Sequence, residues 1–160
     1  CSEPHKFNEL PPQNVSSQTQ KLRCPRSAQI AGNDLRQMSP DTVAILTNKY
    51  AIAVNQDPLG RQATLVANGT ANGSATQVWV KPLQVPKGSF AVAFLNRGKQ
   101  TATIELQFNA PKMPNGGHTL AGAYAATDLG AGGKQVGREK SRVSATVPGT
   151  AAAFYKLTPQ

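Results

Sequence analysis

The sequence is poor in aromatic and acidic residues. Only 6% of its 160 residues are aromatic, with a single tryptophan, whereas a sugar-binding module is expected to expose several aromatic side chains on one face. Eight acidic residues stand against 17 lysines and arginines, and the resulting formal net charge of +9 is compatible with nucleic-acid binding. The positive residues are scattered, however, without interleaved aromatic residues or a known nucleic-acid motif. We therefore expect a solvated basic surface and no nucleic-acid partner.

Cysteine and histidine are also scarce. Cys1 and Cys24 are the two cysteines, and neither has the histidine or cysteine neighbours of a zinc site. They can form one disulfide bond or remain free thiols, and their spacing does not decide between the two. His5 and His118 each stand alone, which favours surface histidines over ligands or bases. The sequence therefore predicts no metal site and no cofactor.

Long hydrophobic runs are absent. No apolar run approaches the roughly 18 residues that a membrane helix requires, so we predict no membrane partner. Residues 1–20 lack the apolar core of a signal peptide. Residues 1–32 are polar and without periodicity, which predicts a disordered segment. A chain that starts at Cys1 is also what a fragment or a processed product would look like.

The sequence has instead many turn formers and a clear alternation of apolar and polar residues from residue 62 onward. The 14 glycines and 12 prolines favour short strands separated by turns. We predict strands over 62–67, 77–82, 89–96, 101–108, 120–125, 136–147 and 151–157. Such spacing indicates a mainly β protein, an antiparallel Greek-key-like β-sandwich, with Val92, Phe94, Ile104, Leu106 and Tyr155 in its core.

The segment 68–74 contains two Asn-Gly signals and is predicted to be an exposed loop between two paired strands. Asn14, Asn68 and Asn72 each begin an N-glycosylation acceptor pattern, and the last two lie in this loop. All three are candidate N-glycosylation sites.

Three further features have alternative interpretations. Residues 130–133 are predicted to form a hairpin loop and not a phosphate cradle, because no Lys-Ser/Thr pair and no helix follow. Trp79 could stack on a sugar, but we favour a place in the core. A basic cluster follows the hairpin loop, with its last three members expected on one solvated strand face; it comprises Lys134, Arg138, Lys140 and Arg142.

The segment 33–60 is the densest in signals. Ser39 is placed to cap a helix, with Pro40 at its first position. Helical spacing of apolar residues follows, and the helix should end near residues 48–49. Residues 51–54 are predicted to form a short buried run of strand type, and residues 55–60 a turn.

This segment closely resembles the melibiase-type α-galactosidases of glycoside hydrolase family 27. About two dozen positions agree in order and spacing between residues 33 and 60, far more than a short motif would. The residues that define the motif are Asn33, Asp34, Leu35, Arg36, Ser39, Pro40, Asn55, Gln56, Asp57, Pro58 and Gly60. The resemblance continues more weakly over residues 78–83, 88–98, 128–130 and 147–159.

The resemblance implies a division of the chain. In that family this block follows the last strand of a (β/α)8 barrel, carries the last barrel helix and leads into a C-terminal antiparallel β-domain. Residues 33–60 would then be a remnant of the last barrel unit, and residues 61–160 the β-domain. Residues 24–32 depart from the family, because they do not suit the apolar barrel strand expected there. Residues 1–32 are therefore expected to be unrelated to it.

The resemblance also implies a function for a parent protein. The family hydrolyses terminal α-D-galactosides with retention, using two aspartates on upstream barrel strands, and a secreted, lysosomal or vacuolar location is expected. None of the eight carboxylates here stands in such a context, so we predict no catalytic residue and an inactive chain. Asp34 and Arg36 are interpreted as a scaffold pair, and Asp57 as a turn carboxylate.

One alternative function accompanies this hypothesis, together with one question about the apolar residues of the helical segment. The chain could be a free-standing β-sandwich that binds carbohydrate or protein. The apolar residues Val43, Leu46, Ile52 and Val54 would lack their barrel partners in either case. They could fold back on the β-domain or stay exposed; we predict that they stay exposed and promote self-association.

Overall fold

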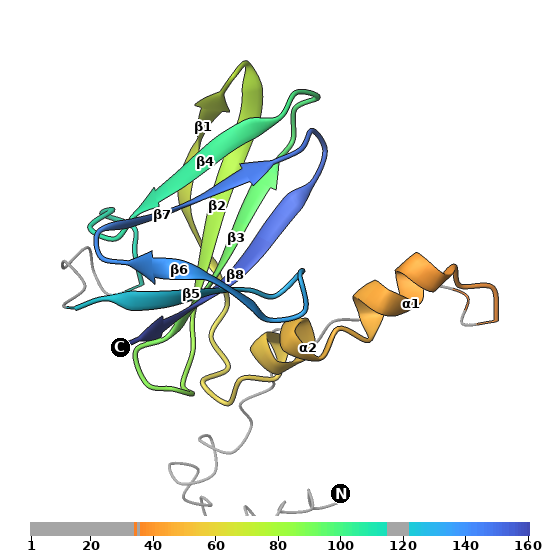
Figure 1. Ribbon diagram of the computed structural model, residues 1–160, viewed down its shortest axis with the longest axis horizontal. Helices are drawn as coiled ribbons and strands as arrows, with labels where there is room; N and C mark the ends of the chain where they lie inside the picture. Colours follow the sequence, from red (N-terminus) through yellow and green to blue (C-terminus); the bar gives the residue numbers. More distant parts are fainter. Residues whose placement is uncertain (1–33, 35, 115–121) are drawn as a thin grey trace, which may run out of the picture.

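The computed structural model of the chain describes residue 34, residues 36–114 and residues 122–160 (Figure 1). Several predictions fall outside these residues: the disordered segment, the pairing of Cys1 and Cys24, the two histidines, and Asn14, Asn33 and Leu35 of the motifs. The described chain is an antiparallel β-sandwich preceded by short helices, which confirms the predicted fold class.

Two helices precede the strands, α1 (Pro40–Leu46) and α2 (Lys49–Asn55). The predicted strand-type run over 51–54 is therefore wrong, because these residues lie inside α2. Asn48 explains the second helix: its side-chain oxygen accepts hydrogen bonds from the backbone N–H groups of Tyr50 and Ala51. Two alanines, at positions 51 and 53, add high helix propensity to the run.

Eight strands follow the helices. They are β1 (Thr64–Ala71), β2 (Ser74–Pro82), β3 (Phe90–Asn96), β4 (Ala102–Gln107), β5 (Tyr124–Asp128), β6 (Lys134–Glu139), β7 (Arg142–Val147) and β8 (Ala152–Pro159). The large sheet has the order β1-β2-β3-β8-β5-β6, and β4 pairs with β7 in a second sheet. Because β7 returns to β4 and β8 enters between β3 and β5, the connectivity is of the Greek-key type.

Two turns differ from their predicted positions. The first hairpin turns at Asn72 and Gly73, whose φ angles of 49° and 72° suit a type I′ turn. The predicted loop over 68–74 is therefore too long, since Asn68 and Gly69 belong to β1 and pair with Gln77 and Thr76. The single strand predicted over 136–147 is also wrong. It is interrupted after Glu139, and its two halves, β6 and β7, belong to different sheets.

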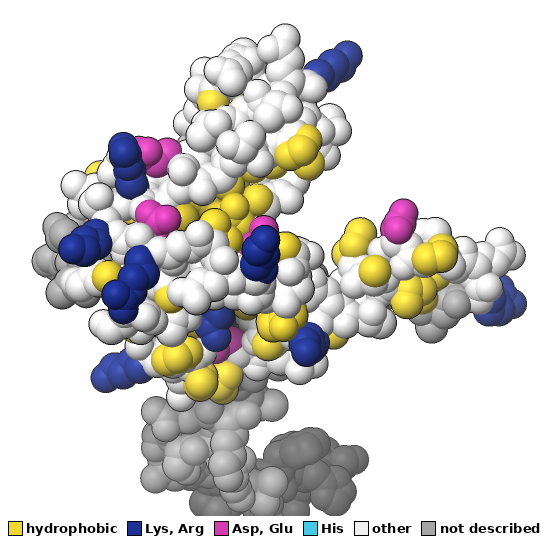
Figure 2. Space-filling view, viewed as in Figure 1, with side chains coloured by type: hydrophobic (Ala, Val, Ile, Leu, Met, Phe, Trp, Pro, Cys, Tyr) yellow, Lys and Arg dark blue, Asp and Glu magenta, His cyan; other side chains and the backbone are white. Residues whose placement is uncertain are grey.

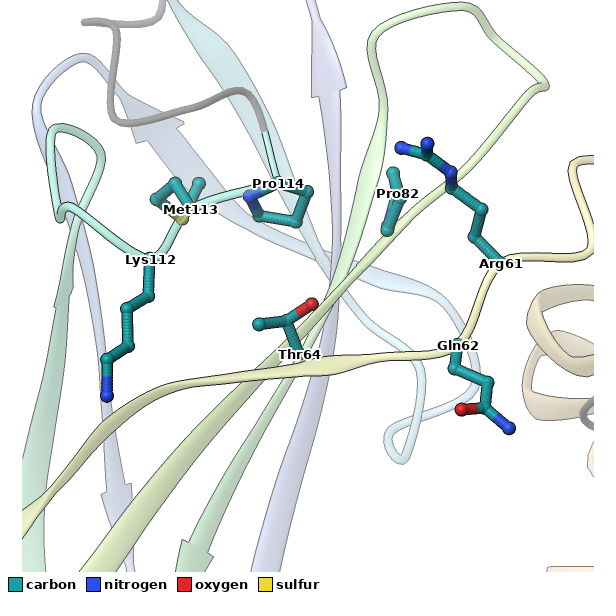
Figure 3. Close-up of a pocket in the computed structure, with 7 residues that line it drawn as sticks. All are labelled: Arg61, Gln62, Thr64, Pro82, Lys112, Met113 and Pro114. Atoms are coloured by element: carbon teal, nitrogen blue, oxygen red, sulfur yellow. The ribbon is translucent and has the colours of Figure 1, made fainter.

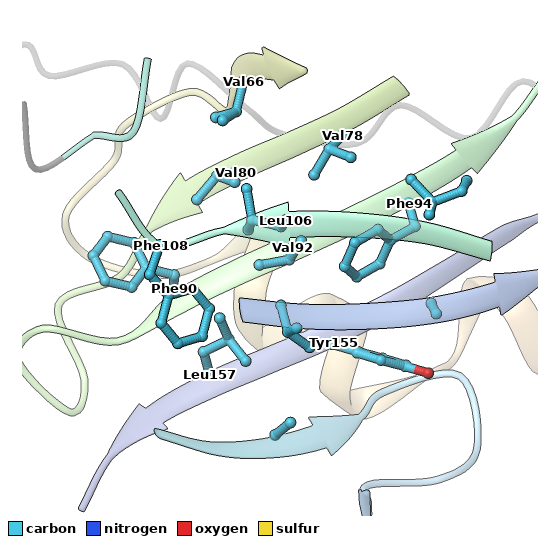
Figure 4. Close-up of a cluster of buried hydrophobic side chains, with 14 of the residues drawn as sticks. Val66, Val78, Val80, Phe90, Val92, Phe94, Leu106, Phe108, Tyr155 and Leu157 are labelled. Carbon is cyan, nitrogen blue, oxygen red and sulfur yellow. The ribbon is translucent and has the colours of Figure 1, made fainter. Parts of the chain in front are cut away.

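The main core lies between the two sheets (Figure 4). The five residues predicted to be in the core, Val92, Phe94, Ile104, Leu106 and Tyr155, are all buried there. The rings of Phe94 and Tyr155 meet edge to face with their centroids 5.7 Å apart. Alternation places every second residue of β4 in this core and the others in solvent.

A second, smaller core lies on the opposite face of the large sheet, where α2 packs. It comprises Val54 of α2 with Leu83, Ala91 and Leu129, and Tyr50 and Phe154 pack against it. The large sheet is thus covered on one face by β4 and β7, and at one end of its other face by α2. The term outer face is used below for this second face.

Candidate functional site

Asp34 and Arg36 form a local pair at the start of the described chain. The Arg36 side chain donates hydrogen bonds to both carboxylate oxygens of Asp34, at 3.1 Å each, and its backbone N–H donates at 3.0 Å. These bonds from Arg36 lower the pKa of Asp34 below its ordinary value. Both residues are exposed, so solvent screens the pair. The geometry ties down a turn.

Helix α1 extends away from the sandwich (Figure 1). The Ser39 side chain accepts a hydrogen bond from the backbone N–H of Thr42, as predicted for a cap. None of its residues is buried, and the side chains of Val43 and Ile45 are 38% and 72% exposed. Apolar side chains are visible on this projecting helix in Figure 2. The predicted exposure is therefore correct for Val43, whereas Leu46, which was also predicted to be exposed, is half-buried.

Helix α2 differs from α1, because it packs against the sandwich. Val54 is 7% exposed and Ile52 is half-buried, so the prediction that these two residues stay exposed is wrong. The side-chain nitrogen of Asn48 donates to the carbonyl oxygen of Leu129 at 2.9 Å, in the turn between β5 and β6. Gly133 of the same turn leaves room for Tyr50, since a Cβ atom on Gly133 would lie 2.5 Å from the tyrosine ring.

Asp57 holds the segment after α2 in place through hydrogen bonds. It is 8% exposed, and its Oδ1 accepts hydrogen bonds from the backbone N–H groups of Leu59 at 3.0 Å and Gln84 at 2.9 Å. The first bond closes a local turn, and the second joins this turn to the connection between β2 and β3. Gly60 follows with a φ of 62°, where glycine is favoured. The hydrogen bonds of Asp57 to backbone N–H groups therefore indicate a structural role in this turn.

The remaining motif residues lie around this junction. Asn55 is the last residue of α2, Gln56 is its C-cap and Pro58 is exposed in the turn that Asp57 closes. Lys81, on the outer face of β2, is 7% exposed, and its ammonium group donates to the carbonyl oxygen of Arg61. The second part of the family motif, residues 55–60, thus occupies the end of α2 and the start of the connection to β1.

An open pocket of about 370 Å³ lies beside this connection (Figure 3). It is lined by Arg61, Gln62, Thr64, Pro82, Lys112, Met113 and Pro114. The lining includes two cations and no carboxylate. A glycosidase site with retention needs two carboxylates, so this pocket lacks the groups for that chemistry.

Two further acidic residues, Asp128 and Glu105, have local partners. Asp128 accepts hydrogen bonds from the backbone N–H groups of Gly130 and Ala131 in the predicted hairpin loop, at 2.8 and 3.0 Å. Glu105 of β4 forms an ion pair with Arg142 of β7 at 3.3 Å. Within the described ranges, no group of three or more His, Cys, Asp or Glu residues could hold a metal ion.

The predicted basic strand face does not exist as such. Arg138 lies on β6 in the large sheet and donates to the side chain of Gln160, whereas Arg142 lies on β7 and pairs with Glu105. The turn after Glu139 separates these two arginines. Figure 2 shows lysines and arginines spread over the visible face, without a concentrated patch.

Trp79 is not in the core, contrary to the prediction. Val78 and Val80 point into the main core, so strand alternation directs Trp79 to the outer face, where it is half-buried. Its indole N–H donates to the side-chain oxygen of Gln77 at 3.3 Å. The Val-Trp-Val pattern was the signal that could have predicted this orientation.

The fold and the packing of α2 together define the class of this domain: an antiparallel β-sandwich with a helix packed at one end of its outer face. Residues 73–157 match the family model described as the alpha galactosidase C-terminal beta sandwich domain, and the chain belongs to this family. The resemblance that the sequence suggested is thereby confirmed.

Relatives and solved structures agree with this assignment. The chain is 40% identical over 102 residues to a probable alpha-galactosidase of Dictyostelium discoideum, covering 63% of this chain and 26% of that protein. It is 34% identical over 131 residues to an alpha-galactosidase of Coffea arabica, covering 82% of this chain and 32% of that protein. The crystal structure of alpha-galactosidase I from Mortierella vinacea shares the fold, with a TM-score of 0.72 and 23% identity over 84% of this chain and 32% of that one.

The chain therefore spans about a quarter to a third of the length of these relatives. Among the described residues, no helix combines the length and apolarity needed to cross a membrane.

Proposed function

We propose that this chain is the C-terminal β-domain of an α-galactosidase-like glycoside hydrolase whose parent hydrolyses terminal α-D-galactosides with retention. The observation that carries the proposal is the family match over residues 73–157, on a sandwich whose N-terminal side leads into a docked helix. A galactoside substrate class is supported by a related structure, described as an α-galactosidase from Saccharomyces cerevisiae with raffinose.

The domain itself is proposed to have a supporting and not a catalytic role. Retention requires two carboxylates roughly 5 Å apart, one as nucleophile and one as acid/base. Four of the described carboxylates already have local partners: Asp34 with Arg36, Glu105 with Arg142, and Asp57 and Asp128 with backbone N–H groups. These contacts favour roles in turns and on strands.

Location and modification follow as proposals of the same kind. The parent is proposed to be secreted, lysosomal or vacuolar, and glycosylated. Of the two acceptor patterns within the described ranges, that of Asn68 fits better. Asn68 is exposed on β1, whereas the side-chain nitrogen of Asn72 donates to the carbonyl oxygen of Thr101 at 3.3 Å. Self-association is proposed to involve the exposed apolar residues of α1.

A free-standing binding module is the second candidate, and the position of Trp79 favours it. An indole on an open sheet face beside the amide of Gln77 has the groups that stack on and hydrogen-bond to a sugar. The two candidates differ in a direct test, because a free-standing module binds raffinose without any other domain.

The test compares the isolated chain with a chimera. In the chimera, this chain replaces the segment of the Dictyostelium relative that it matches. We expect no hydrolysis of a chromogenic α-galactoside by the isolated chain and measurable hydrolysis by the chimera. Turnover by the isolated chain that disappears when one of its carboxylates is mutated would refute the proposal.

A further inference from the structure

The sequence contains three Asn-Gly pairs, at residues 68–69, 72–73 and 115–116, and the last lies outside the described residues. An asparagine loses its side-chain ammonia most readily before glycine, because glycine has no Cβ atom to hinder the approach of its backbone nitrogen. The first two pairs lie in one hairpin and share this chemistry. The structure nevertheless gives their backbones different surroundings.

The pair Asn68-Gly69 belongs to the ladder between β1 and β2, in which Gly69 lies opposite Thr76. The carbonyl oxygen of Ala75 accepts a hydrogen bond from the N–H of Arg97 at 2.8 Å, so the backbone groups of Ala75 point away from β1. Because these directions alternate along a strand, the backbone groups of Thr76 point toward β1. The N–H of Gly69 therefore faces Thr76 within the ladder.

The pair Asn72-Gly73 lies outside the ladder. The last pair of the hairpin joins Ala71 to Ser74, so the two residues between them form the turn. Both turn residues are exposed, and nothing beyond the chain neighbours lies within 4 Å of the position that a Cβ atom would take on Gly73. Rotation of the peptide unit between Asn72 and Gly73 therefore breaks no pair of the ladder. The turn lies at the end of the sandwich away from α2 (Figure 1).

The side chain of Asn72 is held weakly beside this turn. Its Nδ2 donates to the carbonyl oxygen of Thr101 at 3.3 Å, which is long for such a hydrogen bond. Ser74, directly after the turn, is 1% exposed, and its Oγ donates to the carbonyl oxygen of Gln100 at 3.0 Å. The base of the turn is therefore held more firmly than the carboxamide at its tip.

We infer that Asn72 is a site of spontaneous deamidation, with water as the co-reactant, and that the ladder protects Asn68 from the same reaction. The backbone nitrogen of Gly73 loses its proton to solvent and attacks Cγ of Asn72, which forms a C–N bond and closes a succinimide ring. The bond from Cγ to Nδ2 breaks, and this nitrogen takes a proton from solvent and leaves as ammonia. Water then opens the ring at one of its two carbonyl carbons and leaves aspartate or isoaspartate at position 72.

Either product disturbs the turn. A carboxylate has no hydrogen to donate, so two acceptor oxygens would face each other where Nδ2 now meets Thr101. Isoaspartate also adds a carbon atom to the backbone, which the geometry of a two-residue turn does not accommodate. Strand β1 lies at the edge of the large sheet beside β2, so it is the strand that a broken turn loosens. Position 72 can then no longer accept an N-glycan.

The test follows both asparagines in one sample. The full chain, produced without glycans, is incubated in neutral buffer made with heavy-oxygen water, and mass spectrometry of its peptides at intervals gives the conversion at each position. We expect Asn72 to convert about tenfold faster than Asn68, because reaction at Asn68 first requires local opening of the ladder. The new carboxylate should contain heavy oxygen. Asn72→Gln, whose longer side chain closes the ring poorly, should stop conversion at position 72 and leave that of Asn68 unchanged.

Unfolding in urea is the control for the chemistry of the dipeptides alone. Without the ladder, the two conversion rates should agree within about twofold. Equal rates in the folded chain, or faster conversion of Asn68, would overturn the inference. Conversion of Asn72 in the folded chain at less than about a tenth of its rate in urea would also overturn it, because the turn would then be protecting this residue.

Hydrogen exchange tests the structural consequence. In chain enriched in isoaspartate at position 72, the amide of Gly69 should exchange about tenfold faster than in fresh chain. The amide of Phe108, which donates to the carbonyl oxygen of Ser141 at 2.8 Å, should not change, because it joins the ends of β4 and β7 in the second sheet. Unchanged exchange at Gly69 would show that the modification leaves β1 in place and would refute the loosening of this strand.

Discussion

Asn48 links α2 to the sandwich through both ends of its side-chain amide, and alanine at this position removes both links. The oxygen caps α2, and such a cap is worth about 1 kcal/mol. The nitrogen donates to the carbonyl oxygen of Leu129, a bond worth about 0.5–1.5 kcal/mol. We therefore expect Asn48→Ala to lower the free energy of unfolding by about 1.5–2.5 kcal/mol in urea titrations.

Ser39→Ala is the matched control, because it removes a helix cap of the same type. Helix α1 buries none of its residues against the sandwich. Its fraying leaves the cooperative unit intact, so the expected change in unfolding free energy is below about 0.5 kcal/mol. Two N-caps within ten residues of sequence thus have different predicted consequences, and only tertiary contact distinguishes them.

Hydrogen exchange locates the effect of Asn48→Ala. The amides of Ile52 and Gln56 donate within and at the end of α2, so both should exchange about tenfold faster or more in the variant. The amide of Thr47, at the end of α1, should not change. Equal and small effects of Asn48→Ala and Ser39→Ala would show that α2 is not part of the sandwich and would refute this reasoning.

Three further predictions address the sandwich. Phe94→Ala should lower the unfolding free energy by about 3–5 kcal/mol, because the side chain is fully buried; a loss under about 1 kcal/mol would contradict the strand register. Burial raises the pKa of Tyr124 and Tyr155 above the ordinary value of 10.0. The protonated form of each tyrosine therefore adds stability that is complete below pH 10 and is lost as the pH rises through the raised pKa of the folded state. Unfolding measured as a function of pH, together with tyrosinate absorbance, should show this loss. Gly133→Ala should lower the free energy of unfolding by about 1–3 kcal/mol, because residue 133 has a positive φ and a Cβ atom there would clash with Tyr50. The loss measured by calorimetry should be smaller in a Tyr50→Ala background, where only the backbone strain remains.

Much of the fold follows from short-range pattern. The strand β4 is the clearest case, since Ala102, Ile104 and Leu106 alternate with polar residues and all three are buried as the alternation predicts. The Ser39-Pro40 pair likewise places the start of α1 at the observed residue. Both signals depend only on local geometry, which tertiary contacts did not overrule.

The errors occur where two local interpretations compete. Residues 51–54 are a short apolar run, which suits a buried strand or a buried helix segment equally well. The side chain of Asn48 resolves this in favour of a helix, by capping it and binding the β5–β6 turn. Trp79 was misplaced for a different reason, because the alternation of Val78 and Val80 already directs its side chain to the outer face.

The amino-acid sequence by itself determined which residues are apolar, with which period they recur, and to which family their order belongs. It did not determine what covers each apolar face, because that depends on contacts between segments far apart in the chain. The bond from Asn48 to Leu129 joins residues 81 positions apart, and β8 reaches β3 and β5 only through the complete sheet. Such contacts decided that Val54 is buried while Ile45, on a neighbouring helix of the same length, is exposed.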